Sequence, residues 1–118
     1  MEEFRASLEA ESLAAARRAN VERSRLAVLS DTRPAVCDPH LQAVLARSAA
    51  LLHLKSRSMA SGAGHDTAFI SQVAPAAMVF VPCKDGRSHT PEEWTTPEAL
   101  AAGTEVLLES ILAVDAEA

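Results

Sequence analysis

The stretch "PAAMVFVP", residues 75–82, decides how this sequence is expected to fold. Its apolar run, residues 76–81, stands between two prolines. A short continuous apolar run bounded by turn residues is typical of a strand buried on both faces, as in a parallel sheet. We therefore expect a central strand here, covered by helices.

Two amphipathic helices are expected around this run. Residues 39–52 and 97–114 carry apolar side chains at helical spacing, and each segment opens with a proline. Asp38 and Thr96 stand directly before these prolines and are good N-cap residues. A short strand from residue 54 and a short helix between Asp66 and Pro75 complete an alternating order. That order predicts a layered α/β unit.

The amino-terminal segment reads differently. Residues 2–19 have the composition of a helix, with Asn20 as its expected end. Residues 21–30 alternate in polarity, which predicts a strand. A break rich in proline and aspartate, residues 31–40, follows and separates this segment from the rest.

Composition excludes some classes of function. The chain has 118 residues, enough for one modest core, and a net charge of −5 with scattered arginines, which argues against nucleic acid as a partner. There is no apolar run long enough to span a membrane and no signal peptide pattern. Cys37 and Cys83 lie far apart without metal-binding spacing. We expect a cytoplasmic protein that binds neither membrane nor nucleic acid.

The loop after the predicted central strand carries one set of candidate site residues. Ligands gather at the carboxyl ends of strands in open α/β sheets, and this loop, residues 82–94, has that position. His89 is a candidate metal ligand, and Ser88 or Glu93 is near enough to orient its ring. An alternative is a capping box in which Thr90 is the N-cap and Glu93 the N3 residue.

The stretch "SGAGHDT", residues 61–67, carries the second set. Its glycines permit a close backbone approach to a ligand, and His65 lies among them. The alternative is an ordinary turn with a surface histidine. His40 and His53 lie on or beside a predicted helix without acidic or cysteine partners at ligand spacing, and both are interpreted as surface residues.

These residues form part of a metal site at most. Catalytic zinc sites use three protein ligands and usually a carboxylate base. The sequence contains no HxD and no HExxH pattern, and its one pair of adjacent glutamates in the loop, Glu92 and Glu93, falls where a capping box is expected.

Three segments together resemble a known family: "SGAGHD" (61–66), "PAAMVFVPCKDGRSHTPEEW" (75–94) and "EALAAGTEVLLESIL" (98–112). They are similar to the C-terminal end of the N-carbamoyl-L-amino acid hydrolases and allantoate amidohydrolases, a group of aminoacylase/carboxypeptidase-type dinuclear metallohydrolases. Residues 56–113 carry the resemblance strongly. Cys83 stands where the family usually has serine, and Thr67 where it usually has alanine.

The resemblance implies a fold and a division into domains. Residues 32–118 would form the C-terminal part of a three-layer α/β/α catalytic domain. Residues 1–31 would be the last helix and strand of an α+β lid or dimerisation domain. An exposed sheet edge and unmatched helix faces would need a partner, so we expect a homo-oligomer, such as a homodimer.

The resemblance also implies an activity: hydrolysis of a linear amide or ureido C–N bond in a small N-carbamoyl amino acid or allantoate-type substrate. Two divalent metal ions (Zn, Mn, Co or Ni) would activate water beside a glutamate base. The implied roles are metal ligand for His89, substrate contact for Gly64 and His65, and support for Asp66, Ser88 and Glu93.

The rest of that active site has no counterpart in this sequence. The family's other metal ligands, its base and its lid residues lie in regions upstream of the resemblance. We therefore expect no catalytic residue in this chain, at most one metal ligand, and no activity from the chain by itself. The alternative hypothesis is a non-catalytic remnant or small interaction module that retains the fold.

Overall fold

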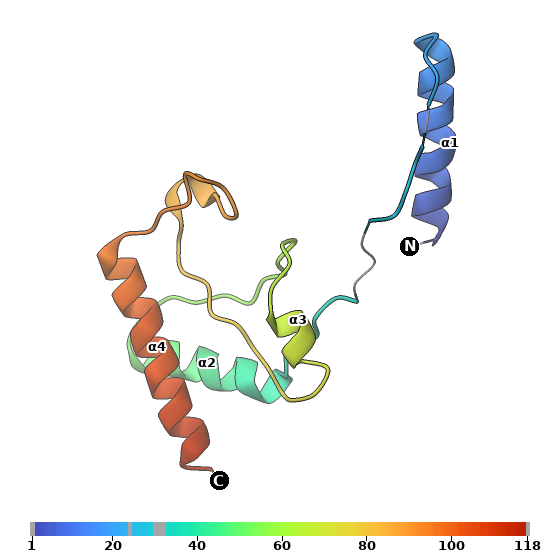
Figure 1. Cartoon of the computed structure of the whole chain (residues 1–118). Helices are drawn as coiled ribbons and strands as arrows, with labels where there is room; N and C mark the ends of the chain where they lie inside the picture. Colours follow the sequence, from blue (N-terminus) through green and yellow to red (C-terminus); the bar gives the residue numbers. More distant parts are fainter. Residues whose placement is uncertain (1, 24, 30–32, 118) are drawn as a thin grey trace. The chain divides into compact units, whose positions relative to one another are not determined.

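The computed structural model, shown in Figure 1, describes residues 2–23, 25–29 and 33–117. The chain divides into two compact units, residues 1–32 and 33–118. The first unit contains helix α1 (Glu2–Arg18). The second contains helices α2 (Pro39–Leu51), α3 (Thr67–Ile70) and α4 (Pro97–Asp115) and the 3₁₀ turn η1 (Lys84–Gly86).

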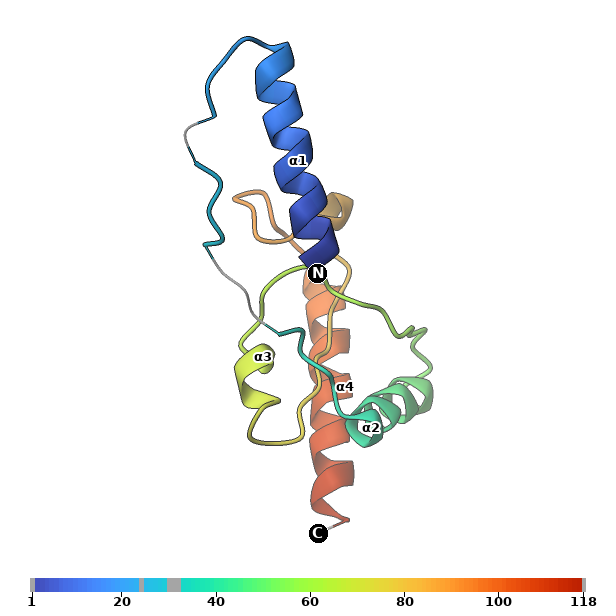
Figure 2. The same ribbon diagram turned by 90° about the vertical axis from the view of Figure 1, so that its right-hand side faces the viewer.

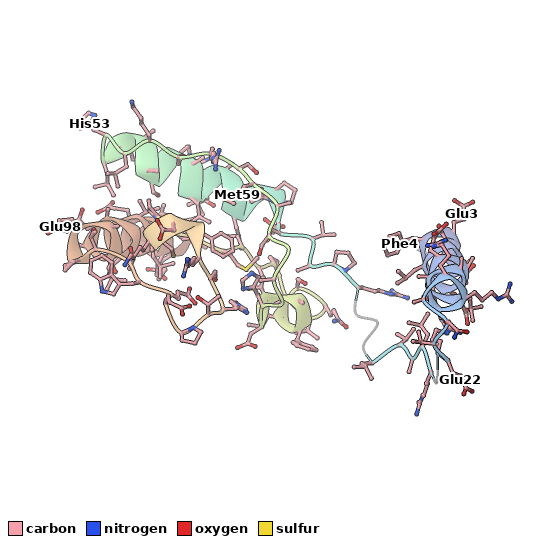
Figure 3. All side chains as sticks on the ribbon, turned by 90° about the horizontal axis from the view of Figure 1, so that it is seen from above. Glu3, Phe4, Glu22, His53, Met59 and Glu98 are labelled. Atoms are coloured by element: carbon pink, nitrogen blue, oxygen red, sulfur yellow. The ribbon has the colours of Figure 1, made fainter. Side chains whose placement is uncertain are left out.

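Helix α1 forms where the sequence predicts it and buries none of its residues. Asn20 ends it with a left-handed backbone (φ 52°), as expected. The chain then folds back, and Arg23 donates from Nη1 to Ser12 Oγ (2.8 Å) and pairs through Nη2 with Glu9 Oε1 (3.4 Å). Figure 3 labels Glu3 and Phe4 in the first turn of α1 and Glu22 beyond its C-terminal end.

The strand expected over residues 21–30 is not found. Residues 21–23 and 25–29 have no strand structure, and residues 24 and 30 lie outside the described part of the chain. A strand is stable only when a neighbouring strand takes up its backbone hydrogen bonds. The described residues of this unit form no such neighbour, and Leu29 is 96% exposed.

The second unit is built on α2 and α4, which pack against each other (Figures 1 and 2). Val44 and Ala49 of α2 and Val106 of α4 are its buried apolar residues among those described. Ser48 and Ser110 are buried in the same interface. The small side chains on both helices allow this close approach.

Both helices begin as predicted. The Leu41 N–H donates to Asp38 Oδ1 (2.9 Å), and Pro39 follows at the first helical position. The Ala99 N–H donates to Thr96 Oγ1 (3.1 Å) in the same way at the start of α4. Each side-chain oxygen satisfies an N–H that has no partner inside its helix.

The central strand expected over residues 76–81 is also not formed, and neither is the short strand from residue 54. The run is tied to α2 by the Asp38 N–H, which donates to the Ala76 carbonyl (2.8 Å). Val79 and Phe80 are exposed, so the expected burial on both faces is wrong. The physical reason is again the absence of a partner strand among the described residues.

The three-layer arrangement is therefore not seen in residues 33–117, which are helical with extended connections. The end of the apolar run contacts α4 instead, where a Cβ atom on Gly103 would overlap the Val81 side chain. Across the described parts of both units, no helix combines the length and the apolar character needed to cross a membrane.

Candidate functional site

The first loop of the site precedes α3. His65 stands two residues before this helix, and its carbonyl accepts from the Ala68 N–H (2.9 Å). Asp66 occupies the N-cap position, but its side chain makes no capping hydrogen bond. Its backbone carbonyl accepts from the Phe69 N–H (2.9 Å) instead. The Asp66 carboxylate therefore does not cap α3.

Two side chains surround the His65 ring. Ser61 Oγ lies 2.7 Å from His65 Nε2, and it also accepts from the Ala63 N–H (3.2 Å). The Phe80 ring lies against the imidazole, with centroids 5.3 Å apart and planes tilted by 57°. His65 is half-buried between these contacts.

The second loop is closed at its base by two hydrogen bonds. The Lys84 N–H donates to the Trp94 carbonyl (2.7 Å), and Thr95 Oγ1 donates to the Pro82 carbonyl (2.7 Å). Within the loop, η1 reverses the chain through Gly86, whose positive φ of 67° suits a residue without a Cβ.

His89 lies near the tip of this loop with a left-handed backbone, φ 58°. Its N–H donates to Glu93 Oε2 (2.8 Å), and Ser88 Oγ donates to Glu93 Oε1 (3.2 Å). Ser88 and Glu93 were expected to support the His89 ring, but the Glu93 carboxylate binds the backbone of His89 instead. Among the described residues, the ring nitrogens of His89 make no hydrogen bond.

The capping box at Thr90 is not formed. Glu93 donates its backbone N–H to the Thr90 carbonyl (3.0 Å), which closes a turn, and no helix begins there. The next helix starts at Pro97.

The fold brings the two loops together at their histidines. The His65 and His89 rings lie edge to face, with centroids 5.7 Å apart and planes at 84°. Residues that the sequence places in separate motifs thus form one cluster with Phe80 and Ser61. In the parts of the chain that the structure describes, no three histidine, cysteine, aspartate or glutamate side chains are grouped to hold a metal ion.

Gly64 lies next to His65 in open space. A Cβ atom added there would meet no atom within 4 Å, and its φ is not positive. The backbone conformation and the packing within this chain therefore do not require glycine. What distinguishes Gly64 in this structure is the open space beside it.

His40 and His53 lie outside the two loops, on the surface, as expected from the sequence. His40 Nε2 lies 2.8 Å from Glu117 Oε2 on the surface. His53 follows α2 at its C-terminal end, with φ 57° (Figure 3). Cys37 and Cys83 are both free and half-buried.

Sequence reasoning missed Ser61 and Phe80 as neighbours of His65. Ser61 precedes His65 by four residues, a spacing that a turn brings together. Phe80 was assigned to a buried strand core, and its exposure is what makes it available to the His65 ring. No sequence signal distinguishes those two roles for an apolar residue.

The sequence pattern of peptidase family M20/M25/M40 matches residues 9–113, and the chain therefore belongs to this family. Membership implies an α/β metallohydrolase fold, and proteins of the family generally bind divalent metal ions.

Individual relatives carry related names. The chain is 45% identical over 82 residues to an N-carbamoyl-L-amino-acid amidohydrolase of Paenarthrobacter aurescens. The matched region covers 70% of this chain and 20% of the relative. It is 36% identical over 92 residues to a ureidoglycolate hydrolase of Arabidopsis thaliana, a match that covers 78% of this chain and 19% of that relative. It is 38% identical over 74 residues to an allantoate amidohydrolase of Bacillus subtilis, a match that covers 63% of this chain and 18% of that relative.

The chain spans about a fifth of the length of these curated relatives. No solved structure matches it significantly.

Proposed function

We propose that this chain forms one part of the active site of a metal-dependent amidohydrolase. The substrate class is a small molecule with a linear amide or ureido C–N bond, of the N-carbamoyl amino acid or allantoate type. The family membership and the names of the relatives support this class. In this proposal His89 is a metal ligand, and His65 with Gly64 contacts the substrate.

The observation that carries the proposal is the meeting of His65 and His89. Their rings lie 5.7 Å apart although they belong to different loops. A metal ligand and a substrate-binding group must lie this close to act on one small molecule. The ring nitrogens of His89, which make no hydrogen bond to the described residues, and the open space at Gly64 support the same assignment.

The described residues do not hold a metal ion by themselves. A catalytic site needs about three protein ligands, and no group of three is present in the described part of this chain. His89 fits as one ligand because its ring is exposed and makes no hydrogen bond to the described residues. When bound, divalent metal ions lower the pKa of water and polarise the bond to be cleaved.

His65 is suited to bind the substrate. Its ring is held by Phe80 on one side and by Ser61 at Nε2. A donor held in this way can bind a substrate carboxylate, or an oxyanion as it develops, without reorganising. Asp66, Ser88 and Glu93 support the site through the backbone conformation of the two loops.

We expect the isolated chain to be inactive, because the base and the remaining ligands are not in it. The alternative is an interaction module that retains the fold without catalysis. A hybrid enzyme distinguishes them: the matching segment of the Paenarthrobacter aurescens relative is replaced by the corresponding residues of this chain. An active hybrid supports the proposal, and a folded but inactive hybrid supports the module.

The same hybrid tests His89. His89→Ala should lower the metal content by one ion per subunit in elemental analysis and abolish hydrolysis. His53→Ala is the matched control, since His53 is also exposed and has nearly the same left-handed φ (57° against 58°). Unchanged metal content in His89→Ala would refute the ligand assignment.

We also propose that the chain associates with a second copy of itself. Large apolar side chains of α4 are about half exposed, among them Leu100, Leu108 and Ile111. Such a face is unusual on a monomer. Light scattering coupled to size exclusion should give twice the chain mass, and a monomer that unfolds cooperatively would contradict it.

The free thiols of Cys37 and Cys83 support a reducing compartment, which we take to be the cytoplasm.

A further inference from the structure

The geometry points to Ser61 as a positioning residue that sets the tautomer of His65. In this inference the Ser61 hydroxyl donates to His65 Nε2, so that the neutral imidazole carries its proton on Nδ1. The consequence for substrate binding rests on the proposed function above. The tautomer itself is a property of this chain and is tested without metal or substrate.

The first step is the hydrogen bonding of Ser61. Its Oγ lies 3.2 Å from the Ala63 nitrogen and 2.7 Å from His65 Nε2. A backbone N–H can only donate, so the Ser61 oxygen accepts from Ala63. The hydroxyl proton then remains to be placed.

The second step assigns that proton. Among the described residues, His65 Nε2 is the acceptor within hydrogen-bonding distance of the Ser61 hydroxyl. Donation to it gives the oxygen one bond as acceptor and one as donor, in a chain from Ala63 N–H through Ser61 to His65. In the opposite arrangement Nε2–H donates to Ser61, whose oxygen then accepts twice, and the hydroxyl proton of this exposed residue turns to solvent. Donation to Nε2 keeps the hydroxyl proton in a hydrogen bond within the protein.

The third step is the consequence for the ring. In a neutral imidazole one nitrogen donates and the other accepts. An accepting Nε2 therefore makes Nδ1 the donor. Nδ1 makes no hydrogen bond to the described residues, while Phe80 and His89 flank the ring and limit its rotation. His65 thus carries a single ring N–H, on Nδ1, which no described residue accepts and which is available to the proposed substrate.

The donor character of the His65 ring then depends on Ser61 as well as on His65 itself. A histidine in this loop without Ser61 would keep its place but would present a mixture of donor and acceptor nitrogens. Ser61 makes Nδ1 a donor, which suits a carboxylate or a carbonyl oxygen of the proposed substrate and disfavours a ligand that offers only N–H groups.

The test is nitrogen NMR of the full chain with ¹⁵N-labelled histidine, at alkaline pH where imidazole rings are neutral. The two ring nitrogens of each histidine have distinct shifts according to which one is protonated. In the unaltered chain, His65 Nδ1 should show the shift of a protonated nitrogen and Nε2 that of an unprotonated one. His53, exposed at the end of α2, is the internal reference for an unconstrained ring.

Ser61→Ala should abolish this preference and move the His65 nitrogen shifts toward those of His53. Ser61→Thr, which keeps the hydroxyl, should retain it. Ser58→Ala removes an exposed hydroxyl from the same connection and is the matched control.

A His65 ring protonated at Nε2 in the unaltered chain would overturn the inference, whether or not any variant folds. An unchanged tautomer in a folded Ser61→Ala chain would also overturn it. The hybrid enzyme then separates this inference from the proposed function. If the tautomer is as expected but the hybrid is inactive, only the proposed function fails; an active hybrid with the other tautomer removes only the role of Ser61.

Discussion

The Ser110 and Ser48 hydroxyl oxygens lie 3.0 Å apart, buried between α4 and α2. Ser110 Oγ also lies 2.7 Å from the Val106 carbonyl, to which it must donate, since a carbonyl only accepts. Ser48 is then the donor to Ser110. This short chain is the polar link in the apolar interface that holds the second unit together.

The two hydroxyls should therefore respond unequally to removal. Ser110→Ala leaves the Ser48 hydroxyl buried without its acceptor and should lower the free energy of unfolding by about 1–3 kcal/mol. Ser48→Ala leaves Ser110 bonded to Val106 and should cost less. The double variant should be more stable than Ser110→Ala, because removing both partners leaves no unsatisfied group.

Urea unfolding followed by circular dichroism measures these differences. Thr104→Ala is the control, because Thr104 Oγ1 donates to the Leu100 carbonyl (2.8 Å) on the exposed side of the same helix. It should change stability by less than about 0.5 kcal/mol. Equal losses from both serine variants would contradict the assigned direction of the hydrogen bonds.

The contact between Gly103 and Val81 gives a prediction with an unambiguous sign. Gly103→Ala would normally stabilise a helix by about 1 kcal/mol. Here the new Cβ would overlap Val81 Cγ1, and the branched valine side chain has little freedom to move aside. We expect a net loss of about 1–3 kcal/mol from overpacking.

Thermal unfolding of Gly103→Ala and of the double variant Gly103→Ala/Val81→Ala checks this contact. The second substitution removes the overlapping methyl groups and should recover part of the stability. A higher unfolding temperature in Gly103→Ala than in the unaltered chain would show that the apolar run does not lie against α4.

The start of α2 should be sensitive to its capping oxygen. Asp38→Ala removes the acceptor for the Leu41 N–H and should cost about 1 kcal/mol. Asp38→Asn keeps a side-chain oxygen and should be nearly neutral. The Asp38 N–H bond to Ala76 involves only the backbone and remains possible in both variants. Urea unfolding of both variants provides the comparison, and equal stability of the two would argue against the cap.

The backbone of His89 should depend on the Glu93 carboxylate. Glu93→Ala removes the acceptor for the His89 N–H and the Ser88 hydroxyl, so hydrogen exchange of the His89 amide should accelerate. The nuclear Overhauser effect between ring protons of His65 and His89 should also weaken, because the His89 backbone would no longer be held at its positive φ. Amide exchange and two-dimensional NMR record both effects.

Two variants control this prediction. Glu93→Gln keeps the accepting oxygen and should retain slow exchange. Glu92→Ala removes the neighbouring carboxylate, which pairs with Arg87 at 3.8 Å and does not bind His89 in the structure. Slow exchange of the His89 amide in a folded Glu93→Ala chain would exclude the carboxylate as its partner.

Local signals in the sequence were sufficient for the helices. The caps at Asp38 and Thr96 and the prolines that follow them lie where they were predicted, and α1 ends at Arg18, just before Asn20 with its left-handed backbone. Each depends on atoms within a few residues along the chain, so the sequence contains the information needed. The family was recognised for the same reason, from ordered motifs that lie close together.

The predicted strands failed for a complementary reason. The apolar pattern of residues 76–81 states that the segment is suited to a buried strand, but a strand also needs a neighbour. No second strand forms among the described residues, so Val79 and Phe80 stay exposed and only Val81 of the run is seen against α4, at Gly103. Residue pattern describes a preference, and pairing decides whether it is realised.

The sequence by itself thus determined the helices, their caps, the family and the residue types of the candidate site. Only the tertiary structure decided that His65 and His89 meet, that Phe80 and Ser61 flank His65, and that Glu93 binds the backbone of His89 and not its ring. The physical reason is the sequence separation of the residues that interact. Capping and helix formation depend on neighbours along the chain, whereas the approach of two loops depends on how the helices and the extended run between them pack.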